Sequence, residues 1–158
     1  MTDLHFVRSD PEAQAASELL AEMREELNDV YETFNRLDNP PLVPDELRGP
    51  DGAYLVGYEG TEAVAGGGLR RLDDGVAEIK RMFVRPVARS RGVARALLGA
   101  LEQTARELGY ERVRLDTGPK QIHGLALYRS AGYVDVPPYN DNPFACFWGE
   151  KVLDGPVA

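Results

Sequence analysis

The sequence predicts one α+β domain, spanning residues 1–158, in which helices pack against a mixed, mostly antiparallel sheet. Strand-like segments separated by short turns follow one another in residues 53–84, as antiparallel strands do. A helical pattern then separates two strand-like segments in residues 78–117, which is typical of a parallel β-α-β unit. The length and the 43% of hydrophobic residues suffice for one core, and no linker or internal repeat divides the chain.

The first fifty residues are predicted to hold one strand, two helices and a loop. Residues 4–8 have strand character, and Asp10-Pro11 opens a helix that runs to about Leu27. A second, short helix extends to about Arg36. Four prolines and one glycine in residues 38–50 then predict a loop without regular structure.

Three adjacent strands are predicted next, as an antiparallel meander. Residues 53–58 and 63–72 are joined through a turn at Gly60, and a second turn leads into a strand that includes residues 78–84. Gly66-Gly67-Gly68 interrupts the middle strand, which indicates a β-bulge, a close approach of another group to the backbone, or a flexible kink. A substrate that approached this strand would also be close to the neighbouring strand, which contains Glu78.

The second half of the chain is predicted to form the β-α-β unit, a further helix and a last strand. Residues 93–108 carry apolar side chains at helical spacing, and Gly109 suits the end of that helix. Residues 110–117 have strand character, so the connection is a right-handed crossover. A helix through residues 125–130 and a strand in residues 144–153 follow.

The turn between strand and helix in the β-α-β unit has the features of a phosphate site. A helix N-terminus offers unpaired N–H groups and the positive end of the helix dipole. Gly92 lets a ligand approach the backbone, and two arginines add positive charge. The segment therefore indicates a pyrophosphate ligand, with a plain helix start as the alternative; it reads Arg89-Ser90-Arg91-Gly92-Val93-Ala94.

At this point the sequence resembles the GNAT superfamily of acyl-CoA-dependent N-acyltransferases. The family turn Arg/Gln-x-x-Gly-x-Gly/Ala is matched by Arg89, Gly92 and Ala94, and the family ending Leu-Tyr-x-x-x-Gly-Phe/Tyr is matched by residues 127–133. The resemblance is specific over about residues 77–133. It implies an α/β/α three-layer fold with six to seven strands, in which the two central parallel strands splay apart.

The resemblance also implies an activity, a cosubstrate and a set of binding residues. The activity is transfer of the acetyl group of acetyl-CoA directly to a primary amine, without a metal or a covalent enzyme intermediate. The strand before the turn would pair its backbone with the pantetheine arm. Gln121 stands where the family often has an asparagine that bonds this arm. The implied cofactor-binding residues are Met82, Phe83, Val84, Arg89, Ser90, Arg91, Gly92, Val93, Ala94, Arg95, Gln121 and Tyr128.

Two residues are candidates for catalysis. The attacking amine must lose a proton, and Glu78 lies where the family's glutamate base lies when there is one. Tyr128 matches the family tyrosine that faces the CoA sulfur, where it would protonate the leaving thiolate; a core tyrosine is the alternative. Alternation predicts that Glu78, Lys80 and Met82 share a face, so Lys80 either holds Glu78 ionised or forms a merely structural pair with it.

Charge and composition narrow the function classes. A net charge of −8 argues against nucleic acid as a partner, and no apolar run of 18 residues predicts a membrane span. The acids in residues 12–32 form either a solvated helix face or a wall that attracts an amine. We expect a cytoplasmic protein, because the sequence has one cysteine and shows no secretory signal. Two histidines and one cysteine argue against a zinc site, and Cys146 is expected to be buried.

Three functions stay open at this stage. We expect an N-acetyltransferase acting on a small-molecule amine. The alternatives are an enzyme that acetylates a protein or peptide amine and a non-catalytic domain that binds acyl-CoA. The sequence has no readable motif for the acceptor. A second copy of the chain is a further possible partner.

Overall fold

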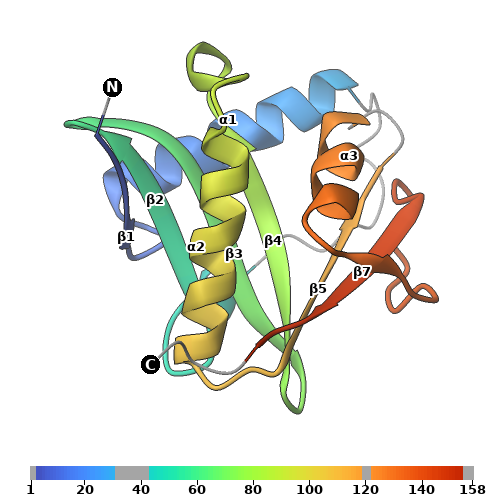
Figure 1. Ribbon diagram of the computed structural model, residues 1–158. Helices are drawn as coiled ribbons and strands as arrows, with labels where there is room; N and C mark the ends of the chain where they lie inside the picture. Colours follow the sequence, from blue (N-terminus) through green and yellow to red (C-terminus); the bar gives the residue numbers. More distant parts are fainter. Residues whose placement is uncertain (1–2, 31–42, 119–121, 155–158) are drawn as a thin grey trace.

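A seven-stranded mixed sheet, covered by helices on both faces, forms the centre of the computed structural model (Figure 1). The structure describes residues 3–30, 43–118 and 122–154. The strand order is β1-β2-β3-β4-β5-β7-β6. Helix α1 covers one face, and α2 and α3 pack against the other (Figure 1). The predicted three-layer α+β fold is therefore confirmed.

The strands and helices agree closely with the predicted segments. The strands are β1 Leu4–Arg8, β2 Ala53–Glu59, β3 Glu62–Asp73, β4 Val76–Val84, β5 Arg112–Thr117, β6 Val134–Asp135 and β7 Phe147–Val152. The helices are α1 Gln14–Val30, α2 Val93–Glu107 and α3 Ile122–Ser130, with short 3-10 helices η1 Pro44–Leu47 and η2 Pro86–Ala88.

Two elements differ from the prediction. Strand β6 was not predicted, because two residues are too few to show alternation. Helix η1 lies inside the segment that we predicted as a loop; its proline stands at the helix start, where the missing N–H group is no loss. The short helix predicted to end near Arg36 falls in residues 31–42, outside the described residues.

The central parallel strands diverge, as the family resemblance implies. Strands β2, β3 and β4 form the predicted antiparallel meander, and β4 pairs in parallel with β5. This parallel pairing covers only residues 76–78 of β4 and 112–114 of β5, although β4 continues to Val84 and β5 to Thr117. Figure 1 shows the gap between the two strands widening toward the start of α2. Backbone groups of β4 beyond Glu78 are thus not paired with β5.

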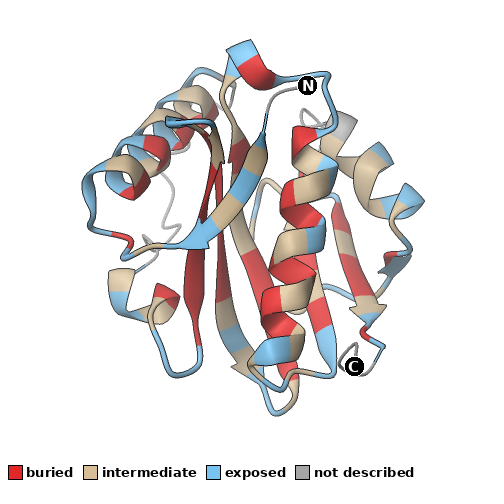
Figure 2. Cartoon of the chain, turned by 60° about the vertical axis from the view of Figure 1, so that its left-hand side comes forward, coloured by how far each residue is buried: buried red, intermediate tan, exposed pale blue. Residues whose placement is uncertain are grey.

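Two buried clusters hold the layers together. The predicted apolar side of α2 packs on the sheet, with Leu97, Leu101 and Ala105 fully buried (Figure 2). On the other face, Leu19 and Met23 of α1 pack against apolar side chains of β2 and β4. Both faces of the sheet are therefore desolvated where the helices lie.

The three consecutive glycines of β3 are explained by packing and by a bulge. The register between β3 and β4 shifts between Gly66 and Gly68. A side chain at Gly66 would overlap the Tyr54 hydroxyl, and one at Gly68 would overlap Leu47. The neighbouring space is filled by the protein's own side chains, so a substrate does not approach the backbone at these glycines.

Gly66→Ala should destabilise the protein by about 1–3 kcal/mol, because the new methyl group would force the buried Tyr54 out of place. The control is Gly99→Ala in the exposed side of α2, where no atom lies within 4 Å of the added carbon. This change should stabilise by up to about 1 kcal/mol, since alanine favours helix. Urea unfolding of the wild type and the two variants measures both changes in unfolding free energy. Equal unfolding free energies for Gly66→Ala and the wild type would contradict the packing argument.

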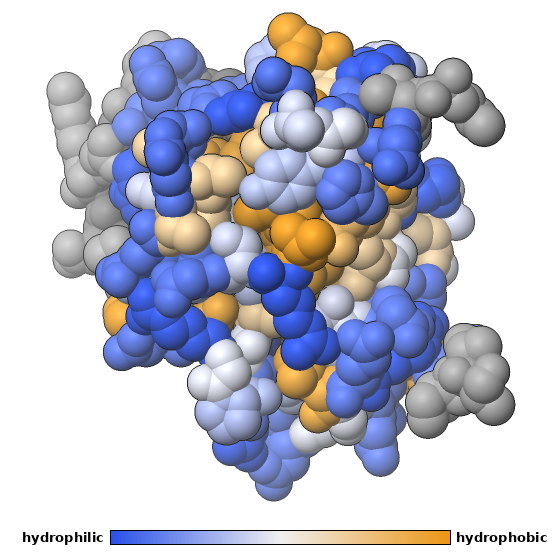
Figure 3. Space-filling view, turned by 90° about the vertical axis from the view of Figure 1, so that its left-hand side faces the viewer, coloured by the Kyte–Doolittle hydropathy of each residue, from blue (hydrophilic) through white to orange (hydrophobic). Residues whose placement is uncertain are grey.

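The surface is predominantly hydrophilic on the side that Figure 3 shows, with apolar residues in small patches. Within residues 3–30, 43–118 and 122–154, no helix is both long and apolar enough to cross a membrane.

Candidate active site

The turn between β4 and α2 leaves a helix N-terminus open. Ser90 and Gly92 have positive φ angles of 65° and 79°, so the chain curls before α2 begins at Val93. A side chain carbon added at Gly92 would have no atom within 4 Å, and no side chain of the described residues caps the helix. The first N–H groups of α2 therefore face open space, as an anion site requires. Val93 itself is buried, so only its backbone is available to a ligand.

The arginines of the turn are paired with acids rather than left as extra positive charge. The Arg89 guanidinium donates to Glu26 Oε2 of α1 at 2.6 Å and to the Val84 carbonyl at 2.8 Å. The Arg91 guanidinium donates to both carboxylate oxygens of Glu59, at 2.6 and 2.9 Å. Arg95 donates to Ser130 Oγ at 2.6 Å. Backbone N–H groups are thus the main phosphate ligands that this arrangement offers.

The acidic face of α1 has counterions in the segment before the turn. Arg85 donates to Glu22 at 2.6 Å and lies 3.8 Å from Glu18. Arg89 and Glu26 are each about 40% exposed, so their ion pair contributes only about 0–1 kcal/mol. Glu18, Glu22 and Glu26 are therefore not a purely solvated face, because they bind the segment that leads into the turn before α2.

A bulge in β4 changes which side chains share a face. Lys80 pairs with Gly68 and Phe83 with Gly66, so two residues of β4, Arg81 and Met82, stand opposite one residue of β3. Arg81 has a φ of 60°, a backbone angle that residues other than glycine rarely adopt. Phe83 joins the α1 side, whereas Met82 packs on the α2 side. The prediction that Met82 shares a face with Glu78 and Lys80 is therefore wrong.

Glu78 is fully buried and lies in a network of charged partners. Its Oε1 accepts from Arg70 Nε at 2.8 Å, and Arg70 Nη2 lies 2.7 Å away. Lys80 Nζ is 3.7 Å from Oε2, so the predicted pair exists but is the weaker one. Arg70 also binds Glu46 of η1. Sequence reasoning missed Arg70, which could have been found from its register position directly opposite Glu78.

Tyr128 lies beside the diverging part of β4. Its hydroxyl is 3.8 Å from Met82 Sδ, which is a weak acceptor, and its ring meets Tyr133 edge-on at a centroid distance of 6.0 Å. Burial, and secondarily the Asp116 carboxylate, raise the pKa of Tyr128 to about 12. At neutral pH this hydroxyl is protonated and has no strong acceptor among the described residues. Such a group can donate a proton to an atom placed between the strands.

The predicted loop of residues 137–143 approaches Glu78 on the α1 side of the sheet, although sequence reasoning named no site residue in it. Asn140 Nδ2 donates to Asp116 Oδ2 at 2.6 Å and lies 3.5 Å from Glu78 Oε2, while Asn140 Oδ1 accepts from Trp148 at 2.9 Å. Burial, then the charges of Glu78 and Asp116, raise the pKa of the adjacent Tyr139. The polar run in residues 140–142 was the available signal, but its partners come from distant strands.

Other predicted residues divide into those the structure places and those it does not. The Met82, Phe83 and Val84 side chains pack in the two clusters, while their backbone lies beyond the paired part of β4 and β5. Gln121 lies outside the described residues. Cys146 is exposed, which corrects the prediction of a buried cysteine; it precedes β7 and its N–H group donates to Thr117. In the described part of the chain, no three histidine, cysteine or acidic residues are grouped to bind a metal.

Comparison with known proteins identifies the family and the fold. Residues 20–133 match the Acetyltransferase (GNAT) family. The chain is 33% identical to an IAA acetyltransferase of Azospirillum brasilense, over 97% of this chain and 100% of the relative. A solved acyl-CoA N-acyltransferase of Klebsiella pneumoniae is 28% identical, with a TM-score of 0.75 over 96% of this chain and 98% of that chain.

A third protein shares the fold at lower identity. The PaiA N-acetyltransferase of Thermoplasma acidophilum, solved in complex with coenzyme A, is 15% identical, with a TM-score of 0.72 over 95% of this chain and 99% of that chain. The family match covers more than half of the sequence, including β4, the phosphate turn, α2, β5 and α3. The chain belongs to the GNAT acetyltransferase family and is an acyltransferase.

Proposed function

We propose that this protein transfers the acetyl group of acetyl-CoA to a primary amine of a small molecule. The observation that carries the proposal is the open N-terminus of α2 beside the diverging strands β4 and β5. Pyrophosphate suits the helix N-terminus, and an extended pantetheine arm suits the edge of β4 that β5 leaves unpaired. Coenzyme A bound to the Thermoplasma acidophilum protein, which has this fold, supports the same ligand class.

The residues supply the chemistry from two sides of β4. Acetyl-CoA would supply the acetyl group as a thioester, and coenzyme A would leave as the free thiol. The Tyr128 hydroxyl would donate its proton to the leaving sulfur, because it stays protonated at neutral pH. Backbone N–H groups of β4 beyond Glu78 would donate to the oxygen that becomes negative as the amine attacks. Glu78, on the opposite side, would take the amine proton directly or through water.

The acceptor is proposed to be small because the loop that contains Asn140 covers Asp116 and approaches Glu78. A release assay for free thiol, run with acetyl-CoA, a panel of primary amines and a lysine-containing peptide, tests this. Thiol release with small amines is expected. Faster release with the peptide would favour a protein acceptor, and bound acetyl-CoA without any release would favour a non-catalytic domain. Cytoplasmic location and a homodimer stay predictions.

Glu78→Gln should lower kcat/KM most near neutral pH, with recovery as rising pH supplies unprotonated amine. Glutamine keeps the size of the side chain but removes its basicity. The measurement is the pH profile of kcat/KM for the wild type and the variant on an amine found in the panel.

A structural role for Glu78 predicts a different result. Loss of one partner from a buried ion pair with Arg70 would cost about 3–5 kcal/mol of unfolding free energy and leave the pH profile parallel to that of the wild type. The control Glu46→Gln disturbs the same Arg70 side chain and leaves Glu78 in place. Parallel profiles for all three proteins would rule out the general-base role.

A further inference from the structure

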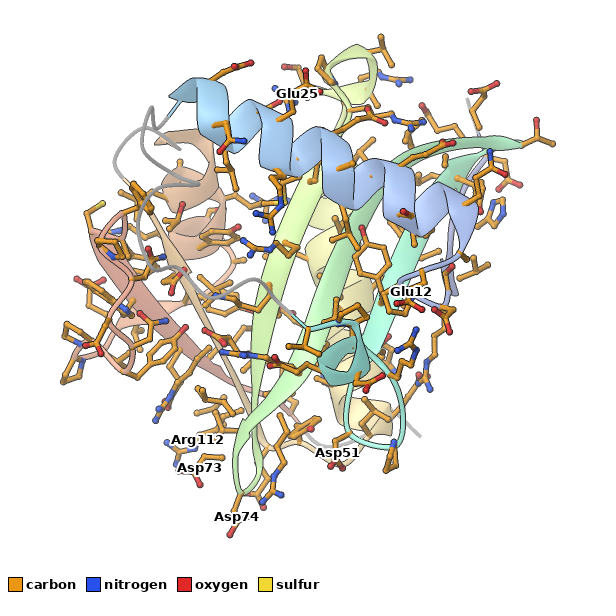
Figure 4. The ribbon with its side chains drawn as sticks, turned by 180° about the vertical axis from the view of Figure 1, so that it is seen from behind. Glu12, Glu25, Asp51, Asp73, Asp74 and Arg112 are labelled. Atoms are coloured by element: carbon orange, nitrogen blue, oxygen red, sulfur yellow. The ribbon has the colours of Figure 1, made fainter. Side chains whose placement is uncertain are left out.

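A pocket of about 220 Å³ lies between α1, η1 and the bulge of β4, on the sheet face that Figure 4 shows behind α1. Its walls are mostly apolar and include Leu20, Met23 and Leu27 of α1 and Leu47 of η1. Two arginines, Arg24 and Arg81, also line it, and no acidic residue does among the residues that the structure describes. This composition suits an organic anion with an apolar body.

The two arginines are close enough to affect each other. Arg81 is half-buried and Arg24 lies on an exposed turn of α1. Burial, and next the positive charge of Arg24, lower the pKa of Arg81. Both side chains also have interactions within the protein. An anion between them would be an added ligand that offsets their repulsion, and guanidinium groups bind carboxylates with two parallel hydrogen bonds.

The pocket adjoins the proposed reaction centre. Arg81 directly precedes Met82, whose sulfur contacts the Tyr128 hydroxyl. The negative charge of Asp116 favours the protonated form of both Arg81 and Tyr128. The pocket and the Tyr128 hydroxyl thus lie on opposite faces of the same bulged part of β4.

We propose that this pocket binds the carboxylate and the apolar group of the acceptor, so that the amine acetylated is an amino acid with an apolar side chain. The proposal rests on the proposed function and names its substrate class. The volume is below the roughly 300–1,000 Å³ of pockets for drug-sized ligands, which fits one amino-acid side chain rather than a peptide.

Matched amines test the proposal. Leucine has a carboxylate, leucinamide has a neutral amide in its place, and isoamylamine has neither group. With saturating acetyl-CoA, we expect kcat/KM for leucine to exceed the other two by about 10- to 100-fold, as a hydrogen-bonded charge pair allows. Phenylalanine, phenylalaninamide and phenethylamine repeat the comparison with a larger side chain.

Arg24→Met should reduce this preference about tenfold and leave the KM of acetyl-CoA unchanged. The matched control is Arg106→Met on α2, whose guanidinium bonds the Asp154 carbonyl far from the pocket; it should keep the preference. Equal use of acid, amide and amine by the wild type, or the same preference in Arg24→Met, would overturn the proposal while leaving acetyl transfer intact.

Calorimetry separates failure of this proposal from failure of the proposed function. N-acetylleucine should bind the wild type and bind Arg24→Met about tenfold more weakly, whereas N-acetylleucinamide should bind both poorly. Such a binding pattern supports the carboxylate site even if no amine causes release of thiol from acetyl-CoA. In that case only the proposed transfer reaction is refuted. Equal binding of the two compounds, or no binding of either, would refute the carboxylate site.

Discussion

Gly92→Asp is expected to remove most of the thermal stabilisation that acetyl-CoA should give to the wild type. At a concentration of 100 times its Kd, a ligand that binds only the native state stabilises it by about 2.7 kcal/mol. For a domain of this size that corresponds to a rise in Tm of roughly 5–10 °C. A carboxylate at residue 92 would stand in the open space before α2, where phosphate must approach the N–H groups.

Gly92→Asn is the matched control for this result. Asparagine has the shape of aspartate and must adopt the same positive φ of 79°, but it carries no charge. Any strain is therefore common to both variants, and Gly92→Asn should retain more of the ligand-induced shift. A wild-type shift in folded Gly92→Asp would show that phosphate does not bind at this turn.

Tyr128→Phe is expected to lower kcat by about 10- to 100-fold while the Kd of acetyl-CoA stays nearly the same. The hydroxyl would act on the leaving sulfur and not on the bound ground state. Since burial raises the pKa of Tyr128 to about 12, its proton is present throughout the range from pH 7 to 9, and the ratio of the two rates should be constant there.

The control is Tyr110→Phe, which removes a hydroxyl that bonds the Asp51 carbonyl at the opposite end of the sheet. It should leave kcat unchanged. Single-turnover measurements separate chemistry from product release. Identical single-turnover rates for Tyr128→Phe and the wild type would mean that Tyr128 is a packing residue.

Local patterns predicted most of the fold because they are set by neighbouring residues. The apolar spacing of α2, the turn at Gly60 and the glycine after α2 each act within one element. The bulge at Arg81 was not predictable from alternation, since it depends on how β4 pairs with the glycines of β3. One extra residue there moved Met82 to the other face of the sheet.

The candidate site was predicted in part for a related reason. Glu78, Tyr128 and the turn before α2 follow motifs within single segments. Arg81 and Asn140 became visible only in three dimensions, because Arg81 lies in a bulge and Asn140 binds residues of other strands, whereas Arg70 required the register between β3 and β4. The residues proposed to bind the acceptor are also brought together only by the fold, which is why the sequence alone did not identify the class of acceptor.

Helix α1 contacts both halves of the proposed site. Its Glu22 and Glu26 bind Arg85 and Arg89 at the turn before α2, and Met23 and Arg24, which lie between them in the sequence, line the proposed acceptor pocket. Figure 4 shows this helix crossing the sheet, with Glu25 on its outer side. A phosphate that draws Arg89 from Glu26 changes the forces on α1. Where this alters the affinity for an acceptor, thermodynamic linkage requires that the acceptor change the affinity for acetyl-CoA by the same factor, and the variant Glu26→Gln tests that coupling.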